Sequence, residues 1–138
     1  MAFESTKREV SELYAFARLL ADGCVPMDRG ERRVMMVERM EHDGPRRYVR
    51  SAEKESVTII CGVKERNGRF VESTDTAPRE VPCELFEALA NALLELLRSG
   101  NSQEVIVPDD IEEVLDELKI YDLEAHTDDR TDFTVTFD

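Results

Sequence analysis

The chain has 138 residues, a formal net charge of −13 at pH 7, 41% hydrophobic residues and 36% charged residues. Such a composition is typical of a globular protein with one hydrophobic core, and it excludes a disordered or collagen-like chain. No apolar stretch reaches the roughly 18 residues that cross a bilayer, and the N-terminus lacks the basic start and apolar run of a signal peptide. We therefore expect a cytoplasmic protein that does not associate with membranes.

The charge is unevenly distributed along the chain. Residues 1–70 carry 14 basic and 12 acidic side chains, whereas residues 71–138 carry 4 basic and 19 acidic side chains. Because nucleic acids are anionic, this balance predicts that nonspecific nucleic-acid binding by the whole molecule is unfavourable.

The first helix is predicted over residues 6–22. Thr6 and Glu9 have the spacing of a capping box, apolar residues then recur at helical spacing, and Gly23 ends the pattern. Phe16 and Leu19 fall outside the main apolar stripe, so the apolar arc is wider than packing against one sheet requires. We expect a second contact for this helix, and a subunit partner is one candidate.

The next two segments are predicted to be a loop, residues 24–30, and a strand, residues 32–40. The second segment fits no single period, and its Glu, Arg and Met content favours helix. The turn signal at residues 43–45 and the short run at residues 47–50 favour a hairpin instead. We adopt the strand interpretation.

The most specific local signal is a hairpin formed by residues 56–63 and 69–71. Residues 56–63 are a β-rich run, and Asn67-Gly68 stands before the short run at residues 69–71. A three-residue loop with Gly68 in the left-handed region would place Val63 opposite Val71.

Beyond this hairpin, residues 73–81 are predicted to be a polar connector, and Pro82 falls in the first turn of a leucine-rich helix that ends at Gly100. Residues 104–107 are predicted to be a short strand, and Pro108 precedes an acidic helix. Strict alternation over residues 121–126 and 133–137 predicts a closing hairpin with one solvated face. The fold class is α+β: a single domain over residues 1–138, with an antiparallel sheet of hairpins packed by about three helices.

Few side chains offer catalytic chemistry. Cys24, Cys61 and Cys83 are odd in number and form no CxxC, which excludes a disulfide framework and a zinc knuckle. Cys83 lies in a first helical turn, where the helix dipole can lower a thiol pKa, but a packed, inert thiol is the favoured interpretation. His42 and His126 lie beside predicted turns without a positioned partner. We predict no catalytic residue, no cofactor and no metal ligand.

The acidic helix and the arginines are the two charged features to which a role can be given. Seven arginines lie between Arg29 and Arg50, and Arg66 and Arg69 flank the Asn-Gly turn. The favoured interpretation pairs these guanidinium groups with the acidic half of the chain. The alternative is a local anion or RNA site, for which the predicted residues are Arg46, Arg47 and Arg50.

The favoured function is a non-catalytic protein-interaction module, such as an adaptor, an inhibitor, an immunity protein or a chaperone-like protein, that binds a basic or amphipathic protein partner. A homo-oligomer, with a dimer favoured, is expected, and nucleic acid is considered an improbable partner. The predicted partner-binding residues are Phe16, Leu19, Asp109, Asp110, Glu113 and Glu117. The alternatives are a small enzyme whose thiol- or histidine-based site assembles from distant residues, and anion or RNA binding through residues 29–50.

Overall fold

The computed structural model describes residues 3–41, 44–99, 104–118, 120 and 133–137. Within these ranges the chain forms three helices: α1 (Lys7–Asp22), α2 (Cys83–Ser99) and α3 (Asp109–Glu117). The strands in the same ranges are β1 (Phe3–Thr6), β2 (Cys24–Met27), β3 (Gly30–Glu41), β4 (Gly44–Ser51), β5 (Ser56–Lys64), β6 (Phe70–Glu72), β7 (Arg79–Pro82), β8 (Glu104–Val107) and β9 (Phe133–Phe137).

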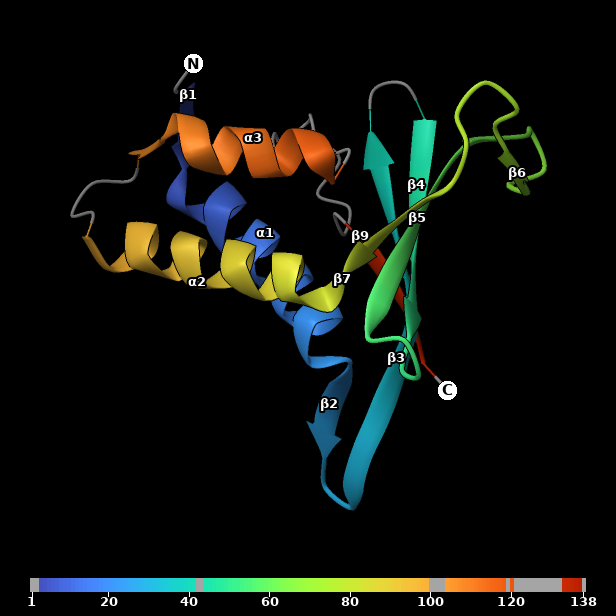
Figure 1. Ribbon diagram of the computed structural model, residues 1–138, viewed down its shortest axis with the longest axis horizontal. Helices are drawn as coiled ribbons and strands as arrows, with labels where there is room; N and C mark the ends of the chain where they lie inside the picture. The colour runs from blue at the N-terminus through green and yellow to red at the C-terminus, as the bar shows by residue number, and fades with distance from the viewer. Residues whose placement is uncertain (1–2, 42–43, 100–103, 119, 121–132, 138) are drawn as a thin grey trace.

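The described strands form two sheets in which every pair is antiparallel. The larger sheet has seven strands: β2 to β6 follow in sequence order, β7 pairs with β5, and β9 pairs with β3. The smaller sheet pairs β1 with β8. Figure 1 shows the helices on one side of the larger sheet, with the β2–β3 hairpin and the β6 region projecting away from the body. The predicted α+β fold with an antiparallel sheet and about three helices is confirmed.

Helix α1 begins and ends as its sequence pattern predicts, at Lys7 and Asp22. Gly23 has a φ of +74° and donates its N–H to the Leu19 carbonyl, which is a glycine-terminated helix end. The second contact expected for this helix lies inside the same chain. Phe16 is completely buried and Leu19 packs against the core, because α1 contacts both α2 and the sheet. Burial therefore contradicts Phe16 as a partner-binding residue.

The ambiguous segment after the first helix is a long strand, which confirms the strand interpretation. β3 pairs with β4 from Met36–Val49 to Glu41–Gly44, so its register leads into the predicted turn. Its buried positions alternate at Val37, Arg39 and Glu41, whose side chains face the helices. The prediction of a loop over residues 24–30 was wrong, because Cys24–Met27 pairs with Gly30–Arg33 as β2.

The hairpin at Asn67-Gly68 has the predicted register. Val63 lies opposite Val71, and Gly68 has a φ of +85°. The Glu65 N–H donates to the Arg69 carbonyl, so the loop itself is the three residues 66–68. The local sequence alone was sufficient to predict this turn.

Of three predictions for the second half, one needs correction, one is confirmed and one lies partly outside the described residues. Arg79–Pro82 is a strand, so the polar connector is shorter than predicted and Pro82 precedes α2 instead of starting it. Glu104–Val107 is a strand as predicted. The last strand, Phe133–Phe137, alternates between half-buried and exposed residues, whereas its predicted partner at residues 121–126 lies outside the described residues.

The core joins the helices to the sheet through a cluster of aromatic rings. The Phe16 ring centroid lies 4.9 Å from that of Tyr48, 5.8 Å from that of Phe133 and 6.3 Å from that of Phe86. Burial raises the pKa of Tyr48, and its hydroxyl donates a hydrogen bond of 2.8 Å to the Leu118 carbonyl after α3. The described helices include none long and apolar enough to span a bilayer.

Candidate functional site

The three arginines predicted to bind an anion already have intramolecular contacts. Arg46 is 2% exposed, and its Nη1 donates to the Gly44 carbonyl at 3.2 Å. Arg50 donates from Nε to the Leu20 carbonyl at 2.7 Å and from Nη2 to the Ala21 carbonyl at 3.2 Å. Two of the three guanidinium groups thus contact backbone carbonyls, one beside the β3–β4 turn and the other at the end of α1.

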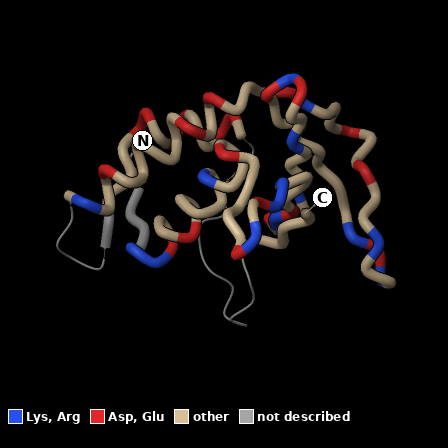
Figure 2. The backbone as a smooth tube through the Cα atoms, turned by 90° about the horizontal axis from the view of Figure 1, so that it is seen from below, with Lys and Arg blue, Asp and Glu red and all other residues tan. Residues whose placement is uncertain are grey.

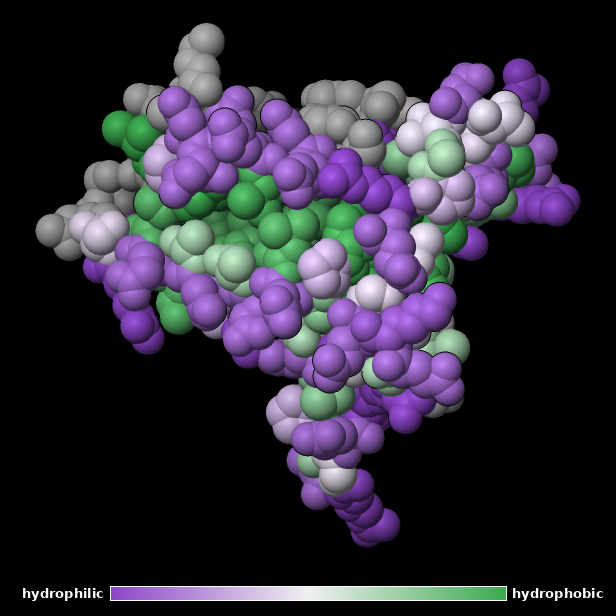
Figure 3. Space-filling view, viewed as in Figure 1, coloured by the Kyte–Doolittle hydropathy of each residue, from purple (hydrophilic) through white to green (hydrophobic). Residues whose placement is uncertain are grey.

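The predicted acidic partner-binding residues lie on α3. Asp109, Asp110, Glu113 and Glu117 are exposed, and Ile111 and Leu115 form the buried side of the helix. Figure 3 shows an apolar band between α2 and α3, bordered by hydrophilic residues. The role of Asp109, Asp110, Glu113 and Glu117 in partner binding remains a prediction.

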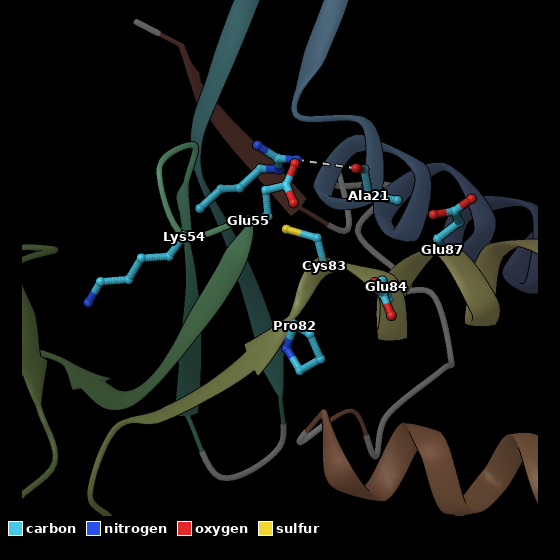
Figure 4. A pocket seen from close by; sticks show the side chains of 8 residues that line it. Ala21, Lys54, Glu55, Pro82, Cys83, Glu84 and Glu87 are labelled. Atoms are coloured by element: carbon cyan, nitrogen blue, oxygen red, sulfur yellow. Dashed lines mark hydrogen bonds between the residues drawn. The ribbon is translucent and has the colours of Figure 1, made fainter.

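Cys83 lies at the start of α2 and lines a pocket of about 390 Å³ (Figure 4). The pocket is also lined by Lys54, Glu55, Glu84 and Glu87, and the dashed line in Figure 4 marks the Arg50 hydrogen bond to Ala21. Burial raises the pKa of the Cys83 thiol, and Arg50 offsets only part of that effect. The thiol is therefore mainly protonated at neutral pH, which makes it a poor nucleophile.

His42 and His126 lie outside the described residues. Among the residues that the structure does describe, no three His, Cys, Asp or Glu side chains gather closely enough to hold a metal ion. The pocket at Cys83 therefore has carboxylates without the geometry of a metal centre.

One exposed basic feature is the end of the β5–β6 hairpin, residues 64–69, which we call the β5–β6 tip. All six residues are exposed, and three are basic while one is acidic. Within the loop, the Gly68 N–H donates to the Glu65 carbonyl at 2.8 Å, and the Asn67 Oδ1 accepts from the Arg69 N–H at 2.9 Å. These bonds order the loop backbone while the Arg66 and Arg69 side chains extend into solvent.

The base of this hairpin is held by ion pairs that join three strands and by a stacking contact to a fourth. Glu38 Oε1 lies 3.0 Å from Arg47 Nε, and Glu38 Oε2 lies 2.7 Å from Lys64 Nζ. The Arg47 guanidinium in turn lies 4.1 Å from the centroid of the Phe70 ring. Burial raises the pKa of Glu38, but the hydrogen bonds from Lys64 and Arg47 outweigh it, so the pKa lies below its ordinary value.

Close packing also fixes the position of Phe70. A Cβ atom at Gly62 would overlap the Phe70 ring and the Val71 carbonyl, so only glycine fits there without displacing the hairpin. Arg47, one of the three predicted anion-binding residues, thus supports the β5–β6 tip from below.

A second projecting hairpin carries arginines at the β2–β3 turn, residues 28–33, which we call the β2–β3 tip. Arg29, Arg32 and Arg33 are exposed there, but Asp28 and Glu31 lie between them. The Arg32 guanidinium stacks at 4.8 Å over the Phe137 ring. Residues 28–33 carry a net charge of +1, whereas residues 64–69 of the β5–β6 tip carry a net charge of +2.

The spatial distribution of charge follows its distribution along the chain. Figure 2 shows basic residues at the projecting end of the β5–β6 hairpin, at the right of the view, and acidic residues along the helical part. Over the described residues, neither Arg66 nor Arg69 makes an ion pair, so the positive charge of the β5–β6 tip faces solvent. An anionic surface is the natural complement of such a tip.

Comparison with known families gives a match that covers nearly the whole chain. The model of the HpaII restriction endonuclease family matches residues 6–138. The chain belongs to the HpaII restriction endonuclease family. Comparison with curated proteins and with solved structures gives no match.

Membership of the HpaII restriction endonuclease family overturns two predictions. The prediction of a non-catalytic protein-interaction module was wrong, since the family is named for a nuclease. The prediction that nucleic acid is an improbable partner was wrong for the same reason. The prediction about nucleic acid used the net charge of the whole chain. The net charge does not show where exposed arginines lie on the surface.

A nuclease family raises the question of a metal ion, because divalent ions commonly assist phosphodiester hydrolysis. Among the described residues no three potential metal ligands gather in one place, and Mg²⁺ itself is usually held by only one or two protein carboxylates. Arg66 and Arg69 were noticed in the sequence only as flanking residues of a turn, and the signal that could have selected them was their position on a tight, exposed hairpin.

Proposed function

We propose that this protein is a DNA-directed endonuclease that binds duplex DNA through its projecting hairpins. The observation that carries the proposal is the match of residues 6–138 to the HpaII restriction endonuclease family. Exposed arginines on two hairpin tips support it, because guanidinium groups bind phosphates and base edges. Acidic residues on the helical side would orient the molecule, since they repel the phosphate backbone.

We also propose that residues 1–138 act as one domain in the cytoplasm. Side chains from all three described helices and from the larger sheet join one hydrophobic cluster, which supports a single folding unit. All three cysteines are free, as is usual in a reducing compartment.

The test combines binding and cleavage of DNA by the purified full chain. In a buffer of low ionic strength with magnesium, we expect the protein to shift a labelled duplex in a gel and to nick or linearise supercoiled plasmid. Binding should weaken steeply as salt increases, because cations are released from the phosphates on association. Failure to bind any duplex at low salt would refute the proposal, and binding without cleavage would refute its enzymatic part.

A further inference from the structure

We propose that the β5–β6 tip is the DNA-reading element of this protein and enters the major groove, with Arg66 and Arg69 contacting guanine edges. The inference rests on the proposed DNA-directed function and goes beyond it by assigning the contact to one hairpin and two side chains. Four observations support it: the shape of the tip, its anchoring, its free charge and the chemistry of its side chains.

The first observation is shape. The hairpin is a two-stranded ribbon whose six tip residues are all exposed, and it projects from the body in Figure 1. Strands in such a ribbon lie about 4.8 Å apart, and the major groove, about 12 Å wide, admits a two-stranded ribbon. The acidic helices lie on the far side of the sheet from this end, so the tip can approach DNA before they do.

The second observation is that the tip is held in one orientation. Glu38 bridges Arg47 and Lys64 with its two oxygens, and Arg47 covers the Phe70 ring. The loop closes through its own backbone hydrogen bonds at 2.8 and 2.9 Å. A reading element with an ordered backbone loses less entropy on binding than a flexible loop does.

The third observation concerns which positive charges remain available. Lys64 is neutralised by Glu38 at 2.7 Å, whereas Arg66 and Arg69 have no ion pair among the described residues. On the β2–β3 tip, by contrast, Arg32 stacks on Phe137 and two acidic residues lie among the arginines. With Lys64 paired, each tip carries a net charge of +1, and the β5–β6 tip differs in that both of its arginines are exposed without an ion pair among the described residues.

The fourth observation is chemical. A guanidinium can donate two hydrogen bonds to O6 and N7 of guanine in the major groove. The Asn67 Oδ1 accepts the Arg69 N–H at 2.9 Å, so the amide of Asn67 is turned toward the loop backbone and the two arginines are the long side chains that extend from the tip. The two arginines consequently make guanine the base that this tip favours.

The experiment measures DNA affinity and guanine accessibility for the full chain and two matched variants. The test variant is Arg66→Ala/Arg69→Ala, and the control, Arg8→Ala/Arg98→Ala, removes the same two charges from exposed helical positions. We expect the test variant to bind a mixed-sequence duplex about 100-fold more weakly and the control to bind about as tightly as the wild type. The wild type should also protect guanine N7 in the bound duplex from dimethyl sulfate, and the test variant should not.

Each remaining outcome overturns a distinct statement. If the test variant binds as tightly as the wild type, the β5–β6 tip is not the DNA contact, although the proposed function stands. If Arg29→Ala/Arg32→Ala weakens binding while the test variant does not, the contact belongs to the β2–β3 tip. If the test variant binds more weakly but the wild type does not protect guanine N7 from dimethyl sulfate, the major-groove assignment is refuted. A wild type that binds no duplex refutes both proposals.

Discussion

The helical side and the hairpin side of the molecule differ in what their residues do. The helices bury leucines and aromatic rings against the sheet, and their outer faces carry acidic side chains. The β2–β3 and β5–β6 hairpins leave the body with few buried side chains, and their exposed ends carry arginines. The burial indicates that stability is concentrated on the helical side, and the proposed DNA contact lies on the other side. Three substitutions test this division.

The largest expected effect comes from Phe16→Ala on the helical side. The substitution removes a fully buried ring that contacts Tyr48, Phe86 and Phe133, and such a loss costs about 3–5 kcal/mol in the free energy of unfolding. Urea denaturation followed by circular dichroism measures the change. The fraction that remains folded should bind DNA as tightly as the wild type.

Met35→Ala is the control for this substitution, because Met35 is 45% exposed on β3. We expect it to change stability by less than about 0.5 kcal/mol. Equal destabilisation by the two substitutions would contradict the view that the aromatic cluster joins the two layers.

A smaller effect, of about 1 kcal/mol, is expected from Glu38→Gln at the base of the β5–β6 hairpin. The carboxylate is only 14% exposed and pairs with Arg47 and Lys64. Its pKa in the folded protein lies below the ordinary value of 4.5, so the stabilisation is complete above that value and disappears as the pH falls through the folded pKa. Urea denaturation at several pH values should show wild type and variant converging under acidic conditions.

The opposite result for Glu38→Gln would be a stability difference that stays constant from neutral pH to below the folded pKa. That result would assign the effect to lost packing instead of to the charge. A variant as stable as the wild type at neutral pH would show that the three-strand network does not hold the hairpin.

The smallest expected effect is a gain of stability from Glu55→Gly in the β4–β5 turn. Glu55 has a φ of +49°, where a residue with a Cβ atom is strained by about 1–2 kcal/mol. Glycine removes this strain but loses more backbone entropy on folding, so a net gain of up to about 1 kcal/mol remains. The thermal unfolding midpoint should rise.

Lys54→Gly is the matched control, because Lys54 is the preceding turn residue and is not among the positive-φ residues of the described chain. Glycine at that position should lower stability by about 0.5–1 kcal/mol. If both glycine variants lower the unfolding midpoint, the conformation of Glu55 is not strained.

The sequence predicted those parts of the fold that short-range signals determine. Gly23 ended α1 and Asn67-Gly68 set the β5–β6 register because each depends on a backbone conformation that neighbouring residues specify. β2 was missed because Cys24–Met27 contains a proline and gains its strand conformation only by pairing with β3. Its formation depends on a tertiary contact that periodicity does not encode.

The candidate site was less predictable than the fold. Arg46, Arg47 and Arg50 attract attention as a dense basic run, yet strand alternation sends Arg46 and Arg50 toward the helices and Arg47 to the opposite face. Arg66 and Arg69 are separated by a turn, and only the hairpin geometry shows that both are exposed at one end. The net charge was misleading because it averages over regions that are far apart in space.

The end of α1 implies a constraint on how the family can vary. Arg50 donates to the Leu20 and Ala21 carbonyls, and a Cβ atom at Gly23 would occupy the space that its guanidinium fills. An arginine on β4 thus performs the capping role that a local residue usually has. Substitutions at positions 23 and 50 should therefore be correlated: homologues should retain both Gly23 and Arg50 or replace both together.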